Sequence, residues 1–289
     1  MIQEQRPFPN RVVIENTTAC NAHCTICPRE KLKRKIEFMG LETFQKLLDD
    51  CVQAGAKKLS LHNFGEPLLD RYLSDKIRYA KSKGIKETYI VTNASLLSKE
   101  LSEKLISAGL DKIKISFYGI DQEEYEKVHI GLNYEKTIKN ICDLLKLKKQ
   151  VKSKTPEVTL RYIGSISNFI RFYRQWSKYR GLCKIITGRL HNYTTGRNYN
   201  PISRIKRPNY LKSCRYVKKS VLYILVNGDV VPCCYDFNGV LFMGNALKQN
   251  IKQIWNGELF RDFRLAHKNH QFEKYPLCAN CDKLNYILI

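Results

Sequence analysis

Three cysteines lie close together near the N-terminus, where Cys20, Cys24 and Cys27 form a C-x3-C-x2-C cluster. Thiolates are the ligands that soft metal centres prefer, so three of them on one short loop can hold one such centre. A four-iron cluster normally takes four cysteines, and a cluster held by only three leaves one iron open to a substrate or cofactor. A zinc ion that takes its fourth ligand from elsewhere in the chain fits the same spacing.

A second set of cysteines lies in the C-terminal third of the chain. Cys214 is followed by Gly228 and Cys233, and Cys278 and Cys281 form a C-x2-C pair much later. Cys214 and Cys233 flank a predicted hairpin, and Cys278 and Cys281 lie on a short C-terminal turn. Together these four thiolates could bind a metal centre with no coordination position left open. From spacing alone this site is either zinc or iron–sulfur.

The other cysteines are expected to stay outside these sites. Cys234 follows Cys233 directly, and neighbouring residues of a strand face opposite ways, so the two compete for one ligand position. The spacing from the preceding glycine favours Cys233. Cys51 and Cys142 lie on apolar faces of predicted helices, and Cys183 begins a predicted strand. We expect Cys51 and Cys142 to be small core residues and Cys183 to be inert.

The elements that must position the first cysteines alternate along the chain from residue 11 to about residue 190. The predicted strands are Arg11–Asn16, Lys57–His62, Glu87–Thr92, Lys112–Phe117, Glu157–Ile163 and Lys184–His191. The predicted helices are Leu41–Ala54, Asp70–Lys83, Lys99–Ala108, Tyr134–Lys149 and Asn168–Tyr179. Such alternation predicts a parallel sheet covered by helices, and six strands are too few to close like the eight-stranded barrel. We therefore expect an α/β fold with an open, partial (β/α)6 TIM-like barrel.

The pattern changes after about residue 192. Residues 193–210 are rich in Gly, Asn, Pro and Ser, which is typical of a connecting loop. Apolar runs on both sides of Asn227-Gly228 predict a β-hairpin, and helical stretches follow at Asn250–Asn256 and Leu259–Lys268. The expected organisation is a barrel core over residues 1–192, a connecting loop over 193–213 and a small cysteine-rich domain over 214–289.

The chain is strongly basic, with 50 Lys and Arg against 27 Asp and Glu and a formal net charge of +23. This charge can attract an anionic partner, such as a phosphorylated substrate or an acidic redox protein, or it can be the solvated faces of Lys-rich helices. No aromatic-interleaved nucleic-acid motif accompanies it, so nucleic acid is not an expected partner.

No segment of the chain is expected to enter or cross a membrane. The longest apolar run, Val221–Val226, is far shorter than the roughly 20 residues of a membrane helix. The N-terminus also lacks the apolar stretch of a signal peptide. We expect a cytoplasmic protein whose 11 cysteines stay reduced and favour metal ligation over disulfides.

With its motifs in this order, the chain resembles the radical S-adenosylmethionine (SAM) superfamily, whose partial barrel carries a three-cysteine loop after its first strand. Three further segments match in sequence order: Asn63–Leu69 with its Gly-Glu pair, Val91–Asn93, and Ile115–Gly119. In that family the open iron of a 4Fe-4S cluster chelates the amino and carboxylate groups of the cofactor's methionine. One electron from the cluster then releases a 5′-deoxyadenosyl radical.

The resemblance implies SAM contacts at five positions of the matching motifs. Ile26 stands where the family usually packs a large apolar residue on adenine. Gly65 and Glu66 are expected to receive the cofactor's amino group, and Glu66 is the only carboxylate in its segment. Asn93 and Ser116, at the ends of the third and fourth strands, are also expected to reach the cofactor.

One position departs from the family pattern, because His129 stands where relatives commonly carry Arg. Histidine is only partly protonated near neutrality, so the cofactor's carboxylate is expected to pair with His129 or with Arg161 on the fifth strand. Arg161 and His191 are also expected near the barrel mouth, where either could orient a polar substrate.

The C-terminal tail resembles the auxiliary-cluster domain of the SPASM/twitch subgroup of this superfamily. The resemblance lies in Gly228–Asp236, Gly244-Asn245, Ile254-Trp255 and Pro276–Cys281. Full SPASM domains continue with three further cysteines, which are absent here. The resemblance therefore implies a single auxiliary 4Fe-4S cluster, fully ligated by Cys214, Cys233, Cys278 and Cys281.

The single-auxiliary layout is similar to that of aminocyclitol dehydrogenases. It implies an oxidoreductase that removes hydrogen from a small polar molecule, sugar- or cyclitol-like, and passes an electron to the auxiliary cluster. A flavodoxin- or ferredoxin-type protein is the expected electron donor. In such an enzyme, one of Cys51, Cys142 and Cys183 could donate a hydrogen atom to a substrate radical instead of being inert. One alternative is the maturation of a ribosomal peptide, and another, of a different class, is a zinc-stabilised nucleic-acid-binding protein.

Overall fold

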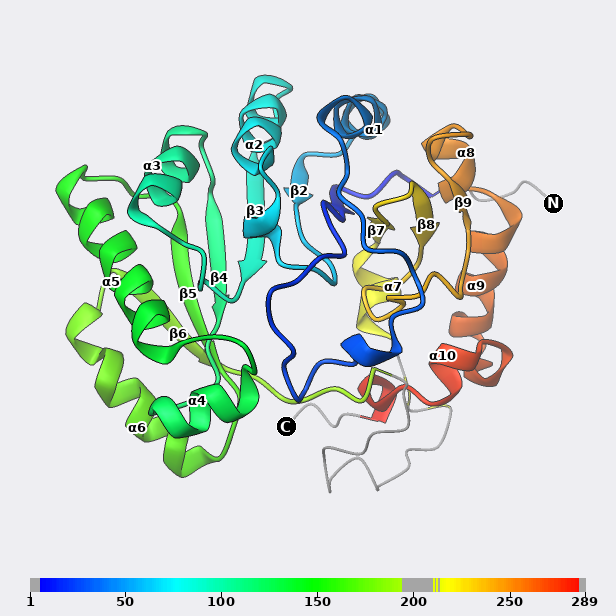
Figure 1. The fold of residues 1–289 in the computed structure, drawn as a ribbon. Helices are drawn as coiled ribbons and strands as arrows, with labels where there is room; N and C mark the ends of the chain where they lie inside the picture. Colours follow the sequence, from blue (N-terminus) through cyan, green and yellow to red (C-terminus); the bar gives the residue numbers. More distant parts are fainter. Residues whose placement is uncertain (1–5, 194–209, 211, 213, 286–289) are drawn as a thin grey trace.

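The computed structural model describes residues 6–193, 210, 212 and 214–285, and Figure 1 shows their arrangement. The structure contains a nine-stranded sheet, and its first six strands are parallel neighbours in the order β6-β5-β4-β3-β2-β1. Their bounds are β1 Arg11–Ile14, β2 Lys58–Ser60, β3 Glu87–Thr92, β4 Lys112–Ser116, β5 Glu157–Tyr162 and β6 Cys183–Thr187. Because the order follows the sequence without a reversal, the sheet is the predicted open, partial barrel.

Helices follow the strands and lie on their outer side (Figure 1). Their bounds are α1 Leu41–Ala54, α2 Leu73–Ser82, α3 Lys99–Ser107, α4 Gln122–Val128, α5 Tyr134–Gln150 and α6 Ile166–Trp176. Alternate strand residues such as Ile90, Ile113 and Ile115 are fully buried in the core beneath these helices. Side chains point to opposite faces of a strand, so the residues between them line the barrel interior.

One helix of the barrel was not predicted. Helix α4 begins after Asp121, whose side chain accepts a hydrogen bond from the backbone N–H of Glu124 at 2.9 Å. The Glu124 carboxylate in turn accepts from the N–H of Ile120 at 2.9 Å. These bonds satisfy backbone groups that a helix start would otherwise leave unpaired, which is what lets so short a helix form. Only Tyr125 of this helix is fully buried, so the segment lacks the periodic pattern of apolar residues from which a helix is predicted.

The C-terminal strands extend the same sheet beyond β1. Strand β7 (Val221–Ile224) pairs in parallel with β1, and β8 (Asp229–Val231) and β9 (Gly244–Asn245) follow in antiparallel order. The hairpin predicted around Asn227-Gly228 is thus confirmed, with Gly228 at a φ of 85° that favours glycine. The pairing of β7 with β1 was not predicted, because hydropathy patterns do not encode which strands become neighbours.

The remaining helices cover the outer side of this extension. They are α7 (Arg215–Lys219), α8 (Ile251–Trp255), α9 (Glu258–Lys268) and α10 (Pro276–Ala279). Most of the segment predicted as a connecting loop, 193–213, lies outside the described residues. In the part of the chain that the structure describes, no helix is both long enough and apolar enough to cross a membrane.

Candidate functional site

The first cysteine cluster lies on the loop that leaves the carboxyl end of β1. Cys20, Cys24 and Cys27 are each half-buried, and the Cys27 N–H donates to the Cys24 carbonyl at 3.0 Å. Burial is the main cause that raises the pKa of the Cys24 thiol to about 12, and the nearby Cys27 and Cys20 raise it further. Three neighbouring thiols on one loop are the donor set that an iron–sulfur cluster would bind as thiolates. The loop therefore fits the predicted cluster.

Gly65 lies directly against this loop, and the close approach explains the residue type. A Cβ atom added there would come within 2.6 Å of the Ala19 carbonyl oxygen. The next residue, Glu66, donates its backbone N–H to the same oxygen at 2.7 Å. Only glycine permits this contact, so the Gly-Glu segment and the cysteine loop form one unit.

Glu66 is 3% exposed and is held by three hydrogen bonds. Its carboxylate accepts from the Thr92 hydroxyl at 2.6 Å, the Asn93 N–H at 2.8 Å and the Leu68 N–H at 3.1 Å. Burial is the largest influence and raises the pKa of Glu66 to about 7, while the three hydrogen bonds act in the opposite direction. A carboxylate offers about four lone-pair sites, so one remains for a further donor.

Asn93 connects the end of β3 to the cysteine loop. Its side-chain amide donates to the Asn21 side-chain oxygen at 3.0 Å, and its own oxygen accepts from the Ser95 N–H at 2.9 Å and hydroxyl at 2.7 Å. The structure therefore brings Gly65, Glu66 and Asn93 together against the first cysteine cluster. Ile26 lies between Cys24 and Cys27 and is half-buried.

His129 contacts one of the cysteines. Its Nδ1 lies 3.2 Å from the Cys24 Sγ, and its Nε2 accepts the Tyr118 backbone N–H at 3.2 Å. Because an accepting Nε2 carries no proton, Nδ1 carries it and donates to the sulfur. His129 is 1% exposed, and burial lowers its pKa to about 3, so the ring is neutral. Both ring nitrogens are therefore engaged within the protein.

Ser116 and Arg161 are direct neighbours on β4 and β5. Both face the barrel interior, and the Tyr118 hydroxyl hydrogen-bonds to Ser116. Burial raises the pKa of Tyr118, the Arg161 guanidinium lowers it, and the Cys24 and Cys27 thiols raise it. Ser116 and Arg161 thus lie at the end of the barrel that carries the first cysteine cluster.

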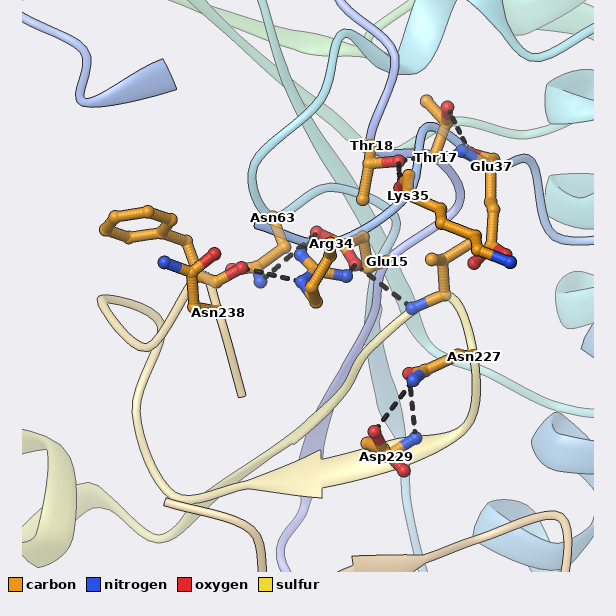
Figure 2. Close-up of polar contacts among 12 residues, drawn as sticks. Glu15, Thr17, Thr18, Arg34, Lys35, Glu37, Asn63, Asn227, Asp229 and Asn238 are labelled. Atoms are coloured by element: carbon orange, nitrogen blue, oxygen red, sulfur yellow. Dashed lines mark hydrogen bonds and ion pairs between the residues drawn. The ribbon is translucent and has the colours of Figure 1, made fainter. Parts of the chain in front are cut away.

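An ion pair that no sequence pattern predicted joins the loop after β1 to the C-terminal strands. Arg34 donates from both terminal nitrogens to the buried Glu15 carboxylate, at 2.6 and 2.9 Å, and from Nε to the Phe237 carbonyl at 2.6 Å (Figure 2). The same carboxylate accepts the Val226 N–H at 3.0 Å. Asn238 adds two bonds to the backbone of Lys31 and Lys33. Three segments far apart in sequence are thereby fixed together.

The second cysteine set surrounds one enclosed hollow. Its walls include Cys214, Cys233, Cys278 and Cys281 together with apolar side chains of Pro232, Leu241, Phe263 and Leu277. Burial raises the pKa of Cys281 to about 12, and the neighbouring Cys233 raises it further. Four sulfurs around an apolar space fit a fully ligated metal centre.

Cys234 is absent from the residues that line this hollow. It packs against the small apolar cluster of Val13, Tyr223, Leu225 and Val231. Strand β8 ends at Val231, so the two cysteines do not lie on a strand, and their side chains hydrogen-bond to each other instead of facing opposite ways as predicted. Cys51 is fully buried in the main core, as expected.

His191 lies beyond the end of β6 and is buried next to the second cysteine set. Its Nδ1 contacts the Asp282 carboxylate, whose other oxygen accepts the Asn192 N–H at 3.0 Å. The ligand atoms of His191, Asp282 and Cys281 lie within 4.8 Å of one another. Strand β6 ends at Thr187 rather than at His191 as predicted, because the chain leaves the sheet there to reach this contact.

Two family models match this chain. Residues 14–164 match the radical SAM superfamily, and residues 214–282 match SPASM, an iron–sulfur cluster-binding domain. The first match begins at the last residue of β1 and spans the first cysteine cluster and the strands β2 to β5. The second spans all four cysteines of the enclosed hollow.

Curated relatives match over different lengths. A probable GTP 3′,8-cyclase of Methanococcus maripaludis is 32% identical over 126 residues, which are 43% of this chain and 42% of the relative. The matched stretch is thus less than half of that protein. An S-adenosyl-L-methionine-dependent 2-deoxy-scyllo-inosamine dehydrogenase of Niallia circulans is 25% identical over 286 residues, 95% of this chain and 93% of the relative.

Solved structures share the fold. BtrN in complex with AdoMet and 2-DOIA superposes with a TM-score of 0.66 at 20% identity, covering 99% of this chain and 100% of that one. SuiB of Streptococcus suis bound to precursor peptide SuiA gives 0.70 at 16% identity, covering 96% and 71%. With a family model that spans more than half of the sequence, the chain belongs to the radical SAM superfamily, with S-adenosylmethionine, a 4Fe-4S cluster and an auxiliary iron–sulfur cluster as its cofactors.

Proposed function

We propose that this protein oxidises an alcohol carbon of a small polar molecule. The observation that carries the proposal is the presence of two separate cysteine sets, one with three thiols on the loop after β1 and one with four thiols around the enclosed hollow. Reductive cleavage of SAM at the first centre supplies a 5′-deoxyadenosyl radical. The substrate then loses one hydrogen atom to that radical, one proton to a base and one electron to the auxiliary centre, which balances a two-electron oxidation.

The residues around the first centre have distinct proposed roles. Cys20, Cys24 and Cys27 hold the cluster. Glu66 accepts the cofactor's amino group at its remaining lone-pair site, with Gly65 allowing the close approach to the loop. Ile26 packs on adenine.

Further residues are assigned by their place at the barrel mouth. Asn93 reaches the cofactor from the end of β3, and Ser116 and Arg161 face its carboxylate. His129 is assigned to the Cys24 sulfur instead of the carboxylate, because both of its ring nitrogens are already engaged. Cys214, Cys233, Cys278 and Cys281 hold the auxiliary cluster.

The proposed dehydrogenase function is supported by the similarity to the 2-deoxy-scyllo-inosamine dehydrogenase, which matches over 95% of this chain. A reduced flavodoxin or ferredoxin is the proposed electron donor, and a cytoplasmic location suits thiols that must stay reduced. We also propose the division into a core over residues 1–192, a connecting loop over 193–213 and an auxiliary domain over 214–289.

Peptide maturation is the second candidate function. Its support is the likeness in fold to SuiB bound to its precursor peptide, a likeness at 16% identity. The two candidates differ in what must enter the barrel, because a peptide needs an open groove whereas a small molecule can be enclosed.

The test is anaerobic reconstitution with iron and sulfide, followed by reduction and addition of SAM. We expect brown protein that releases 5′-deoxyadenosine, and a Cys24→Ala variant that does not. Addition of 2-deoxy-scyllo-inosamine or a related alcohol should raise the yield and give a ketone two mass units lighter. Colourless, zinc-loaded protein that binds DNA would contradict the proposal, and turnover of a precursor peptide alone would favour the second candidate.

A further inference from the structure

The cations on the barrel strands fall into two groups that differ in their partners. In the first group, Arg11 contacts Glu87, Lys112 Nζ lies 2.7 Å from the same carboxylate, and Lys184 Nζ lies 3.0 Å from Glu157. Each cation of this group therefore has an acidic neighbour. The arrangement is the usual way in which a protein compensates charges inside a sheet.

The second group contains Lys114 on β4 and Arg161 on β5. In the register of the two strands Lys114 is beside Thr159 and Ser116 is beside Arg161, so Lys114 and Arg161 are diagonal neighbours on one face. Both are half-buried. Within the described residues neither forms an ion pair with a carboxylate.

The surroundings hold these two side chains in place without neutralising them. Lys114 Nζ lies 5.4 Å from the centroid of the Tyr89 ring. The Arg161 guanidinium packs against the backbone of Gly188, where an added Cβ would come within 2.5 Å of a guanidinium nitrogen. Glu66 and Glu15, two buried carboxylates of this region, are already occupied by other donors.

Two like charges in a partly desolvated space destabilise each other unless an anion joins them. The pKa of Lys114 shows the effect: burial lowers it to about 8, and the Arg161 guanidinium is the next cause. Cys234 is a further neighbour of Lys114. This places the lysine on the side of the barrel interior that faces the auxiliary cysteines.

We propose that Lys114, together with Arg161, binds a phosphate or carboxylate group carried by the substrate. The inference rests on the proposed function only in taking the barrel interior as the substrate site. Arg161 lies between Ser116 and Lys114, and the five donors of its guanidinium allow it to face the cofactor on one side and the substrate on the other. The favoured substrate class is therefore a small alcohol that also carries an anionic group.

The methionine carboxylate of SAM is another source of the same chemistry, so the test must separate the two. Reconstituted holoenzyme with SAM bound is titrated with inorganic phosphate and, separately, with malonate by calorimetry at fixed chloride concentration. Lys114→Met is compared with Lys104→Met. Lys104 is 60% exposed on α3 and pairs only with Glu100, so its loss makes the same change in net charge away from the barrel.

We expect Lys114→Met to weaken binding of phosphate or malonate about tenfold or more, as for loss of a charge-assisted contact, and Lys104→Met to leave it unchanged. Lys114→Arg should retain most of the affinity. SAM affinity should be the same in all four proteins. Equal anion binding by the two methionine variants would overturn the inference, and so would an equal loss of SAM affinity in Lys114→Met, which would assign the lysine to the cofactor.

The two proposals can fail independently. Release of 5′-deoxyadenosine by the reduced wild-type enzyme tests the proposed function without any added anion. If that release is absent while phosphate binding depends on Lys114, the anion site stands and the enzymatic proposal fails. If release occurs but no anion binds, the anion site is wrong and the enzymatic proposal stands.

Discussion

The Nδ1 atom of His129 lies 3.2 Å from the Sγ atom of Cys24, and the Tyr118 N–H fixes the ring so that this nitrogen is the donor. The two residues are 105 positions apart in sequence. Hydrogen bonds to cluster sulfurs stabilise the more negative, reduced state and so raise the reduction potential. His129 is therefore assigned as a residue that tunes the first cluster.

The first prediction concerns that potential. His129→Phe removes the donor, and the one-electron potential of the first cluster should fall by roughly 40 mV, the equivalent of about 1 kcal/mol for one hydrogen bond. His129→Asn keeps a side-chain donor and should lose less. His23→Phe is the control, since His23 is an exposed residue of the same loop. Redox titration followed by electron paramagnetic resonance makes the measurement, and identical potentials in all variants would refute the assignment.

The second prediction concerns the ion pair between Glu15 and Arg34. Arg34→Met leaves a fully buried carboxylate without its partner, a change that typically costs about 3–5 kcal/mol. Arg78→Met breaks the exposed pair with Asp75 and should cost less than about 1 kcal/mol. Denaturant unfolding of the holoprotein compares them. A small effect of Arg34→Met would mean that the loop is held by other contacts.

The third prediction separates the adjacent cysteines. Wild-type protein should hold roughly eight irons, four in each cluster. Cys233→Ala should lose about half of them, whereas Cys234→Ala should keep them all, because Cys233 lines the hollow and Cys234 does not. Iron and sulfide analysis after reconstitution decides between them. The reverse result would exchange the two assignments.

The fourth prediction concerns pH. The pKa of Glu66 is raised to about 7, so the carboxylate that we propose to receive the cofactor's amino group protonates as the pH falls below 7. SAM affinity should then fall, approaching about tenfold per pH unit well below the pKa. Glu66→Gln should bind weakly at every pH with a flat profile. Glu100→Gln, an exposed control, should follow the wild type; calorimetry between pH 6 and 8 tests both.

The raised pKa of Glu66 also makes the stability of the folded protein depend on pH. Folded Glu66 holds a proton between its ordinary pKa and about 7 that the unfolded chain has released. Stability therefore falls as the pH rises through this window and is constant above it. In Glu66→Gln this part of the pH dependence should disappear from unfolding curves.

Local patterns in the sequence were sufficient for the barrel and for the cysteine sets. The period-two strand Glu87–Thr92 and the amphipathic helix Leu41–Ala54 have the bounds that the pattern predicts. Helix α4 was missed because its start depends on side-chain bonds from Asp121 and Glu124, which hydropathy does not record.

Contacts between distant segments were the part that could not be predicted. Three contacts form only because the fold brings their residues together. They are His129 with Cys24, Glu15 with Arg34, and His191 with Asp282. One partial signal existed for His129, since it departs from the arginine common in the family at a position that the motif identifies. No sequence pattern indicated the contact of Glu15 with Arg34 or that of Asp282 with His191.

The parallel pairing of β7 with β1 joins the barrel and the C-terminal strands in one sheet. Neighbouring strands of a sheet are about 4.8 Å apart and are fixed by main-chain hydrogen bonds. Under the proposed function, the substrate must give up a hydrogen atom near the first cysteine set and an electron to the second. The separation between the two sets would then limit the size of the substrate.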